Sequence, residues 1–73
     1  MVNYLEINGA EQLGAIIRRR RKELGVRIDE AALMIGISKN TLSDIENGAS
    51  GVSIGKVLLI VQELGIKLFT KSE

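Results

Sequence analysis

Four short stretches of helical periodicity, each closed by a glycine, limit most strongly what this chain can fold into. Apolar residues recur every three or four positions in the ranges 10–24, 28–35, 39–47 and 54–64. The glycines that follow them are Gly25, Gly36, Gly48 and Gly65, and glycine readily ends a helix. Because 73 residues allow only one domain, the pattern predicts a single all-α domain of four helices over residues 1–73.

Residues that can cap a helix stand before three of these stretches. Asn8 and Glu11 have the spacing of a capping box for the first helix. Ser38 and Ser53 precede the third and fourth helices, where a serine side chain can accept a hydrogen bond from a free amide. These capping residues therefore predict where three of the four helices begin.

One side of each helix is expected to face a shared core. The second helix begins at Arg27 or Asp29, and the expected inner residues of all four helices are, in chain order, Ala10, Leu13, Ile17, Leu24, Ile28, Ala31, Ala32, Ile35, Leu42, Ile45, Ile54, Val57, Leu58, Val61 and Leu64. Leu33 and Met34 are apolar too. We favour their entry into the core after a small rotation of the second helix; the alternative is an exposed patch for a partner.

The end of the chain follows a different period. Residues 66–71 alternate in the manner of a β-strand. A lone strand leaves its backbone groups unpaired and needs a partner from another chain. We therefore predict a dimerisation strand over about 66–71 that pairs with its copy across a two-fold axis. Its interface residues would be Ile66, Leu68, Phe69 and Thr70.

The second and third helices have the spacing of a helix-turn-helix. About three residues around Gly36 separate them, which predicts such a unit over about residues 28–47. In this motif the second helix enters the major groove of DNA, with its first residues near the base edges. Since Leu42 and Ile45 point inward, short hydrogen-bonding side chains remain on the outer face.

These outer side chains suit the reading of DNA. Asn40 can bridge adenine, Lys39 can donate to guanine and Asp44 can accept from cytosine. Thr41 and Ser43 suit phosphate oxygens. The full set of candidate DNA-binding residues is Lys39, Asn40, Thr41, Ser43, Asp44, Asn47 and Arg27.

Charge and composition narrow the possible classes of function further. The net charge is only +1, but half of the ten Lys and Arg residues stand together at positions 18–22. That run either contacts phosphate or forms a solvated helix face. The chain has no cysteine and no histidine, so we expect no disulfide, no metal site, no cofactor and no enzymatic activity. No signal peptide or membrane span is expected, which favours a soluble, cytoplasmic, nucleoid-associated protein.

The stretch "LGAIIRRRRKELGVRIDEAALMIGISKNTLSDIENG" resembles the Xre/Cro-type helix-turn-helix domain of phage and bacterial repressors. The resemblance covers roughly residues 12–65 and implies a four-helix, lambda-repressor-like fold in a sequence-specific repressor. It also implies a buried ion pair between Arg21 and Glu46 that would lock the first helix to the third. The alternative is that Glu46 faces solvent.

Within that family, a short chain with "LGIKLFTK" after the fourth helix is most similar to the HipB-type antitoxins. This resemblance implies a homodimer that binds palindromic operator DNA and a HipA-like serine/threonine kinase toxin. Candidate surfaces for the toxin are the outer face of the first helix at Arg18, Arg19 and Lys22, the Leu33–Met34 patch, and the tail after Phe69.

Two departures from the family pattern leave other functions open. Ile28 stands where the family usually has a phosphate-contacting glutamine, and Asp44 places an acid on the DNA-reading face. A protein-interaction module that no longer reads DNA is therefore one alternative. A stand-alone Xre-type repressor without a toxin is the other.

Overall fold

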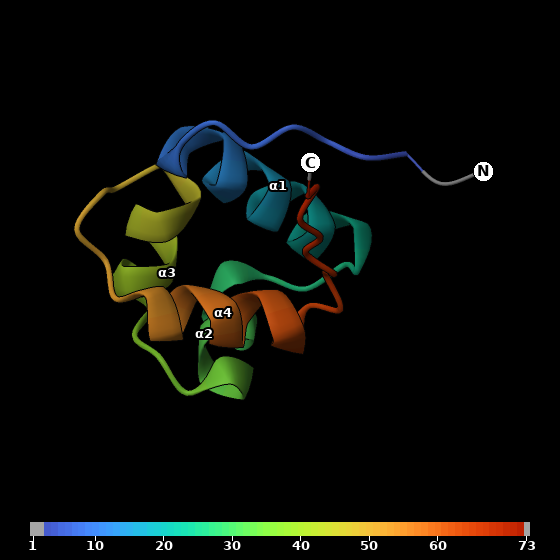
Figure 1. Cartoon of the computed structure of the whole chain (residues 1–73). Helices are drawn as coiled ribbons and strands as arrows, with labels where there is room; N and C mark the ends of the chain where they lie inside the picture. Colours follow the sequence, from blue (N-terminus) through green and yellow to red (C-terminus); the bar gives the residue numbers. More distant parts are fainter. Residues whose placement is uncertain (1–2, 73) are drawn as a thin grey trace.

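Four helices arranged around one core make up the regular structure of residues 3–72, the part of the chain that this computed structural model describes. They are α1 (Ala10–Glu23), α2 (Ile28–Ile35), α3 (Lys39–Glu46) and α4 (Ile54–Glu63). In Figure 1, α4 crosses in front of α2, α3 lies to the left and α1 runs across the top. The predicted all-α fold with four helices is confirmed.

The turn between α2 and α3 is short because Gly36 reverses the chain in a left-handed conformation. Gly36 has φ 89° and ψ 31°, which costs glycine little and other residues more. The amides of Gly36 and Ile37 both donate to the Ala32 carbonyl, at 2.9 and 3.0 Å. The Ser38 hydroxyl then accepts from the Thr41 amide at 3.0 Å and caps α3. These bonds set the angle between the two helices.

Each helix contributes large or small apolar residues to the core. Ile17, Leu42 and Ile60 have no exposed surface, and they come from α1, α3 and α4. From α2 come Ala31, Ala32 and Ile35, all buried. Burying a side chain of the isoleucine or leucine class contributes about 1.5–3 kcal/mol, so these few residues carry much of the stability of so small a domain.

A glycine lets α1 lie directly against the end of α3. A Cβ atom placed on Gly14 would overlap the Ile45 carbonyl oxygen and lie 2.8 Å from the Glu46 carbonyl oxygen. Real Cβ atoms do not approach so closely, so a side chain here would push the two backbones apart. Gly14 thus sets the distance between α1 and α3.

The start of α1 differs from the predicted capping box. Gly9 is the N-cap and has no side chain to accept a bond, so a box between Asn8 and Glu11 is wrong. The helix begins one residue later than that box requires, and Gln12 takes the third helical position. Its side-chain oxygen accepts a hydrogen bond from the Asn8 amide. At the ends of α1, Ala10 and Leu24 are exposed rather than buried.

The inner face of α4 also differs from the prediction. Val61 and Leu64 are buried as predicted, and Ile60 is fully buried, whereas Ile54 and Leu58 are 71% and 41% exposed. Apolar residues cover more of this helix than the side that packs, so periodicity alone did not separate Ile60 from Ile54 and Leu58. Ser53 precedes α4 as expected, but its side chain makes no capping bond.

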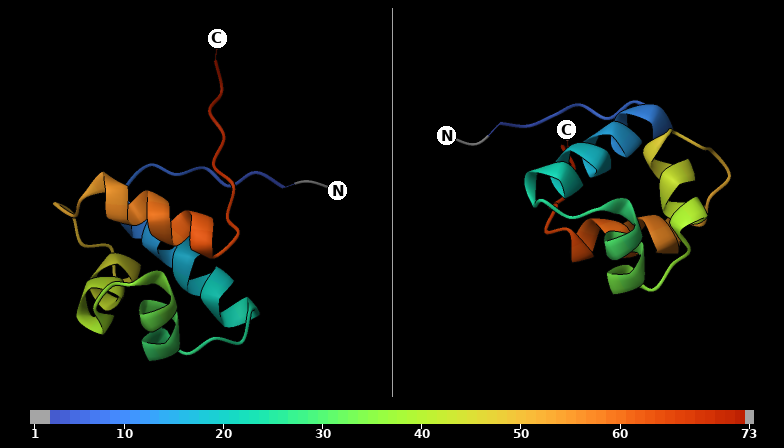
Figure 2. Two further views of the ribbon diagram at one scale, coloured as in Figure 1. Left: turned by 90° about the horizontal axis from the view of Figure 1, so that it is seen from below. Right: turned by 180° about the vertical axis from the view of Figure 1, so that it is seen from behind.

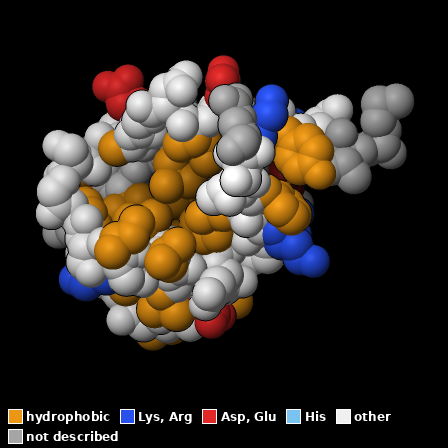
Figure 3. Space-filling view, viewed as in Figure 1, with side chains coloured by type: hydrophobic (Ala, Val, Ile, Leu, Met, Phe, Trp, Pro, Cys, Tyr) orange, Lys and Arg blue, Asp and Glu red, His pale blue; other side chains and the backbone are white. Residues whose placement is uncertain are grey.

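The outer side of α4 leaves the molecule with a broad apolar surface. Figure 3 shows hydrophobic side chains gathered on the face from which α4 is seen in Figure 1. Its exposed large residues on α4 are Ile54, Leu58 and Leu59. Monomeric proteins rarely keep a large continuous apolar patch in water.

The tail after α4 has no regular secondary structure among the described residues. Its first residue is anchored, because the Ile66 amide donates to the Val61 carbonyl at 2.9 Å. The rest extends away from the helices (Figure 2, left). Phe69 meets the ring of Tyr4 edge to face, with ring centres 5.7 Å apart. A strand needs a paired neighbour, so the dimerisation strand at 66–71 stays a prediction.

Candidate nucleic-acid interface

A buried ion pair joins α1 to the end of α3. Arg21 donates from Nε to Glu46 Oε2 at 2.7 Å and from Nη2 to Glu46 Oε1 at 2.9 Å. The two side chains are only 10% and 3% exposed. The structure therefore brings these two residues together in the fork-to-carboxylate geometry in which arginine binds most tightly.

The third nitrogen of the guanidinium also donates a hydrogen bond. Arg21 Nη1 donates to the Val26 carbonyl, at 3.0 Å, in the turn before α2. The hydrogen bond to Glu46 is the main cause of the raised pKa of Arg21, so this charge is held permanently. One side chain thus links α1, the α1–α2 turn and α3.

The outer face of α3 presents a row of free polar groups to solvent. Lys39, Asn40, Asp44 and Asn47 are exposed, while Thr41 and Ser43 are half-buried. The opposite face holds Leu42, Ile45 and Glu46 in the core. With 3.6 residues per turn, this burial leaves the polar row pointing straight away from the protein.

Some of these groups already have partners within the chain. The Ser38 hydroxyl donates to Thr41 Oγ1 at 2.8 Å, so Thr41 belongs to the cap of α3. Asn47 Nδ2 reaches Ser43 Oγ at 3.5 Å. In contrast, no ion pair within residues 3–72 involves Lys39 or Asp44. The free groups lie at both ends of the outer face.

Arg27 lies at the start of α2, apart from the α3 row. It pairs with Asp29 through two hydrogen bonds, of 2.7 and 3.2 Å. That bond lowers the pKa of Asp29 and raises the pKa of Arg27. Sequence reasoning missed Asp29 as a partner, although an arginine two residues before an acid at a helix start was a signal for it. Ile28, next to it, packs against the core.

Leu33 and Met34 do not enter the core. They are 83% and 69% exposed on the outer side of α2, so the favoured prediction of repacking is wrong. Ala31, Ala32 and Ile35 already fill the inner side of this helix. The two residues instead form an exposed Leu33–Met34 patch, and a partner for this patch stays a prediction.

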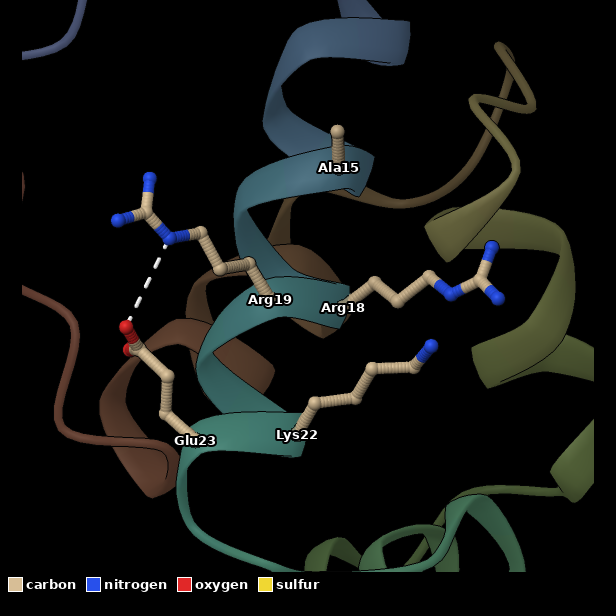
Figure 4. Close-up of a pocket in the computed structure, with 5 residues that line it drawn as sticks. All are labelled: Ala15, Arg18, Arg19, Lys22 and Glu23. Carbon is tan, nitrogen blue, oxygen red and sulfur yellow. Dashed lines mark ion pairs between the residues drawn. The ribbon is translucent and has the colours of Figure 1, made fainter.

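The five consecutive cations of α1 have different surroundings. Arg21 is buried against Glu46, and Arg20 Nε donates to the Leu64 carbonyl at 2.9 Å. Arg19 lies 3.6 Å from Glu23. Figure 4 shows Arg18 and Lys22 side by side on the other side of the helix, away from that pair. The run is therefore not one uniform basic face.

Neither a metal-binding cluster nor a membrane-spanning helix is found among the described residues. No three of their acidic side chains come close enough to hold a metal ion. Between residues 3 and 72, every helix is too short or too polar to cross a bilayer.

Comparison with known proteins gives the same class as the fold. The helix-turn-helix family model HTH_3 matches residues 17–70. The uncharacterized HTH-type transcriptional regulator y4mF of Sinorhizobium fredii is 39% identical over 56 residues, which are 77% of this chain and 74% of that protein. The ImmF control region 10 kDa protein of Bacillus phage phi105 is 47% identical over 38 residues, which span 52% of this chain and 42% of that protein.

Solved structures resemble this one closely. A chain of the HipA-HipB-O2-O3 complex superposes with a TM-score of 0.84 at 25% identity, covering 94% of this chain and 97% of that one. The clp gene regulator ClgR from C. glutamicum gives a TM-score of 0.74 at 30% identity, covering 90% and 85%. The shared architecture extends over nearly the whole chain.

The fold and the match to the helix-turn-helix family model define a helix-turn-helix transcriptional regulator. The chain belongs to the HTH_3 helix-turn-helix family, and it is of the Xre type. That family consists of DNA-binding regulators and not of enzymes.

Replacing Glu46 tests the ion pair. In Glu46→Ala, Arg21 would stay buried without a counter-charge, so we expect unfolding to become about 3–5 kcal/mol easier. Glu63→Ala is the control, because Glu63 lies exposed on α4 and should change stability by less than about 0.5 kcal/mol. Urea titration followed by circular dichroism measures both. Equal midpoints would show that the pair does not hold α1 to α3.

Proposed function

We propose that this protein is a sequence-specific DNA-binding repressor that acts in the cytoplasm as the HipB-like antitoxin of a toxin–antitoxin operon. The outer face of α3 is the single observation that carries the DNA-binding part. It is an exposed row of short polar groups on a helix held firmly by Arg21 and Glu46. Rigid placement matters because base edges are read by hydrogen bonds of defined geometry.

Each exposed group on α3 has a base or backbone atom that it can bind. Asn40 bridges adenine, Lys39 donates to guanine, and Asp44 accepts from the amino group of cytosine. Asp44 has no cation beside it in the described part of the chain. Its charge therefore repels DNA unless a cytosine is opposite, which makes it a determinant of specificity. Ser43, Asn47 and Arg27 contact phosphates.

A homodimer is the second part of the proposal. The exposed apolar residues of α4 and the tail (Ile54, Leu58, Leu59, Leu68 and Phe69) need a covering surface. A second copy, paired through residues 66–71, supplies that surface and the missing neighbour of the strand. Two copies would present two α3 helices to a palindromic operator.

The HipA-like kinase toxin is the third part. The likeness to HipB in its complexes with HipA and with operator DNA supports it. The Leu33–Met34 patch is the surface that we assign to the toxin, because it lies on α2, away from the outer face of α3. Toxin and DNA could then bind at the same time.

Truncating Asn40 tests base reading. Binding sites are selected from random-sequence DNA, and affinity is measured by fluorescence anisotropy at several salt concentrations. The selected sites should be palindromic, with half-sites about 34 Å apart. Asn40→Ala should weaken binding by about 1–3 kcal/mol and relax the preference at one base pair. Asn3→Ala removes the same amide from the N-terminal segment and should change nothing. If both variants bind alike, α3 does not read the bases as assigned.

Shortening the tail tests the dimer. Deleting residues 66–73 removes the strand, so the molar mass measured by light scattering should fall by half while circular dichroism still shows helix. Deleting only 72–73 leaves the strand and should leave the dimer intact. A dimer that survives the longer deletion would place the interface elsewhere.

Co-expression with the neighbouring gene tests the antitoxin. A HipA-like kinase encoded there should co-elute with this protein in size-exclusion chromatography. The double variant Leu33→Ser/Met34→Ser should lose the kinase yet keep operator binding, whereas Leu24→Ser, at the exposed C-cap of α1, should keep both. If no kinase is encoded there or none co-elutes, the antitoxin part is wrong and the DNA-binding part stands.

A further inference from the structure

Two of the five consecutive cations of α1, Arg18 and Lys22, have no ion-pair partner among residues 3–72. Both side chains are exposed. They are four positions apart, so they lie one above the other on the same side of the helix. Figure 4 shows both side chains extended together, while Arg19 leaves the opposite side toward Glu23.

The same side of α1 borders α3. Gly14 and Arg21 are the points where α1 contacts the end of α3. Gly14, Arg18 and Lys22 form one row with a spacing of four residues, so the two cations flank this contact. In Figure 4 both extend toward the ribbon of α3. Because the two backbones touch at Gly14 and the buried Arg21–Glu46 pair joins them, the backbone of α1 at the two cations keeps a set position relative to α3.

A helix that enters the major groove has a DNA backbone strand along each of its edges, because the groove is only about 12 Å wide. The edge of α3 that faces α1 must therefore approach one of these strands. Long cationic side chains beside that edge can reach phosphate oxygens, and free cations do so without first losing another partner.

We propose that Arg18 and Lys22 form a phosphate-binding site on α1 that clamps the DNA backbone beside α3. This inference rests on the proposed DNA binding and adds a contact from outside the helix-turn-helix. The site adds affinity for every DNA sequence and carries no base preference. It also sets the register of α3 in the groove, and it removes this face of α1 from the surfaces open to a toxin.

The test is the salt dependence of the double variant Arg18→Gln/Lys22→Gln. Two lost phosphate contacts should make the negative slope of log affinity against log salt shallower by about 1.8 for each bound chain. Affinity should fall by the same factor for selected and random DNA, and the preferred bases should not change. Both side chains are exposed, so the thermal unfolding curve should match that of the parent.

Arg19→Gln/Lys56→Gln is the control with the same loss of charge. Arg19 pairs with Glu23 on the other side of α1, and Lys56 is exposed on α4, outside the strand assigned to the dimer, so the salt slope of this variant should stay near that of the parent. A parent-like slope in Arg18→Gln/Lys22→Gln would overturn the site while leaving the proposed function intact. Equal losses in the two variants would also overturn it, since only the overall charge would then matter. Absence of DNA binding by the parent would instead refute the proposed function.

Discussion

The contact between α1 and the end of α3 is the constraint on which the rest of this structure depends. Gly14 lets the two backbones touch, and the Arg21–Glu46 pair closes the contact with two charged hydrogen bonds. Neither the close approach at Gly14 nor the Arg21–Glu46 pair would hold α1 against α3 without the other. A side chain at position 14 would separate the helices and pull the guanidinium away from the carboxylate. An unpaired Arg21 would be a buried charge, which is costly.

This contact decides how the outer side of α3 can be used. Because Leu42, Ile45 and Glu46 lie on the buried side of α3, the side chains on its opposite side face solvent. Their groups are short and polar, so the surface contributes little to stability and is free to serve recognition. A third hydrogen bond of Arg21, from Nη1 to the Val26 carbonyl, extends the support to the turn that precedes α2. The buried Arg21–Glu46 ion pair thus positions the polar and charged side chains on the outer face of α3.

Small size explains the distribution of apolar residues. A domain this short buries only a modest part of its surface, and its core is completed by few side chains. Ile54, Leu58 and Leu59 on α4 are left outside, together with Leu33 and Met34 on α2. In a regulator of this size, such surfaces are suited to association with other chains, since no further domain within the described residues covers them.

The sequence by itself determined the four helices, the turn at Gly36 and the row of polar groups on α3. These follow from local rules of periodicity, capping and glycine conformation, which act within a few residues. The pairing of Arg21 with Glu46 was expected from the family resemblance and not from spacing. Only the tertiary structure decided that Ile60 packs while Ile54 and Leu58 stay outside, because the apolar residues of α4 cover more of the helix than its neighbours can bury. The tertiary structure likewise decided the exposure of Leu33. The five consecutive cations point in successive directions around α1, and within residues 3–72 only Arg20 and Arg21 meet partners that are distant in sequence.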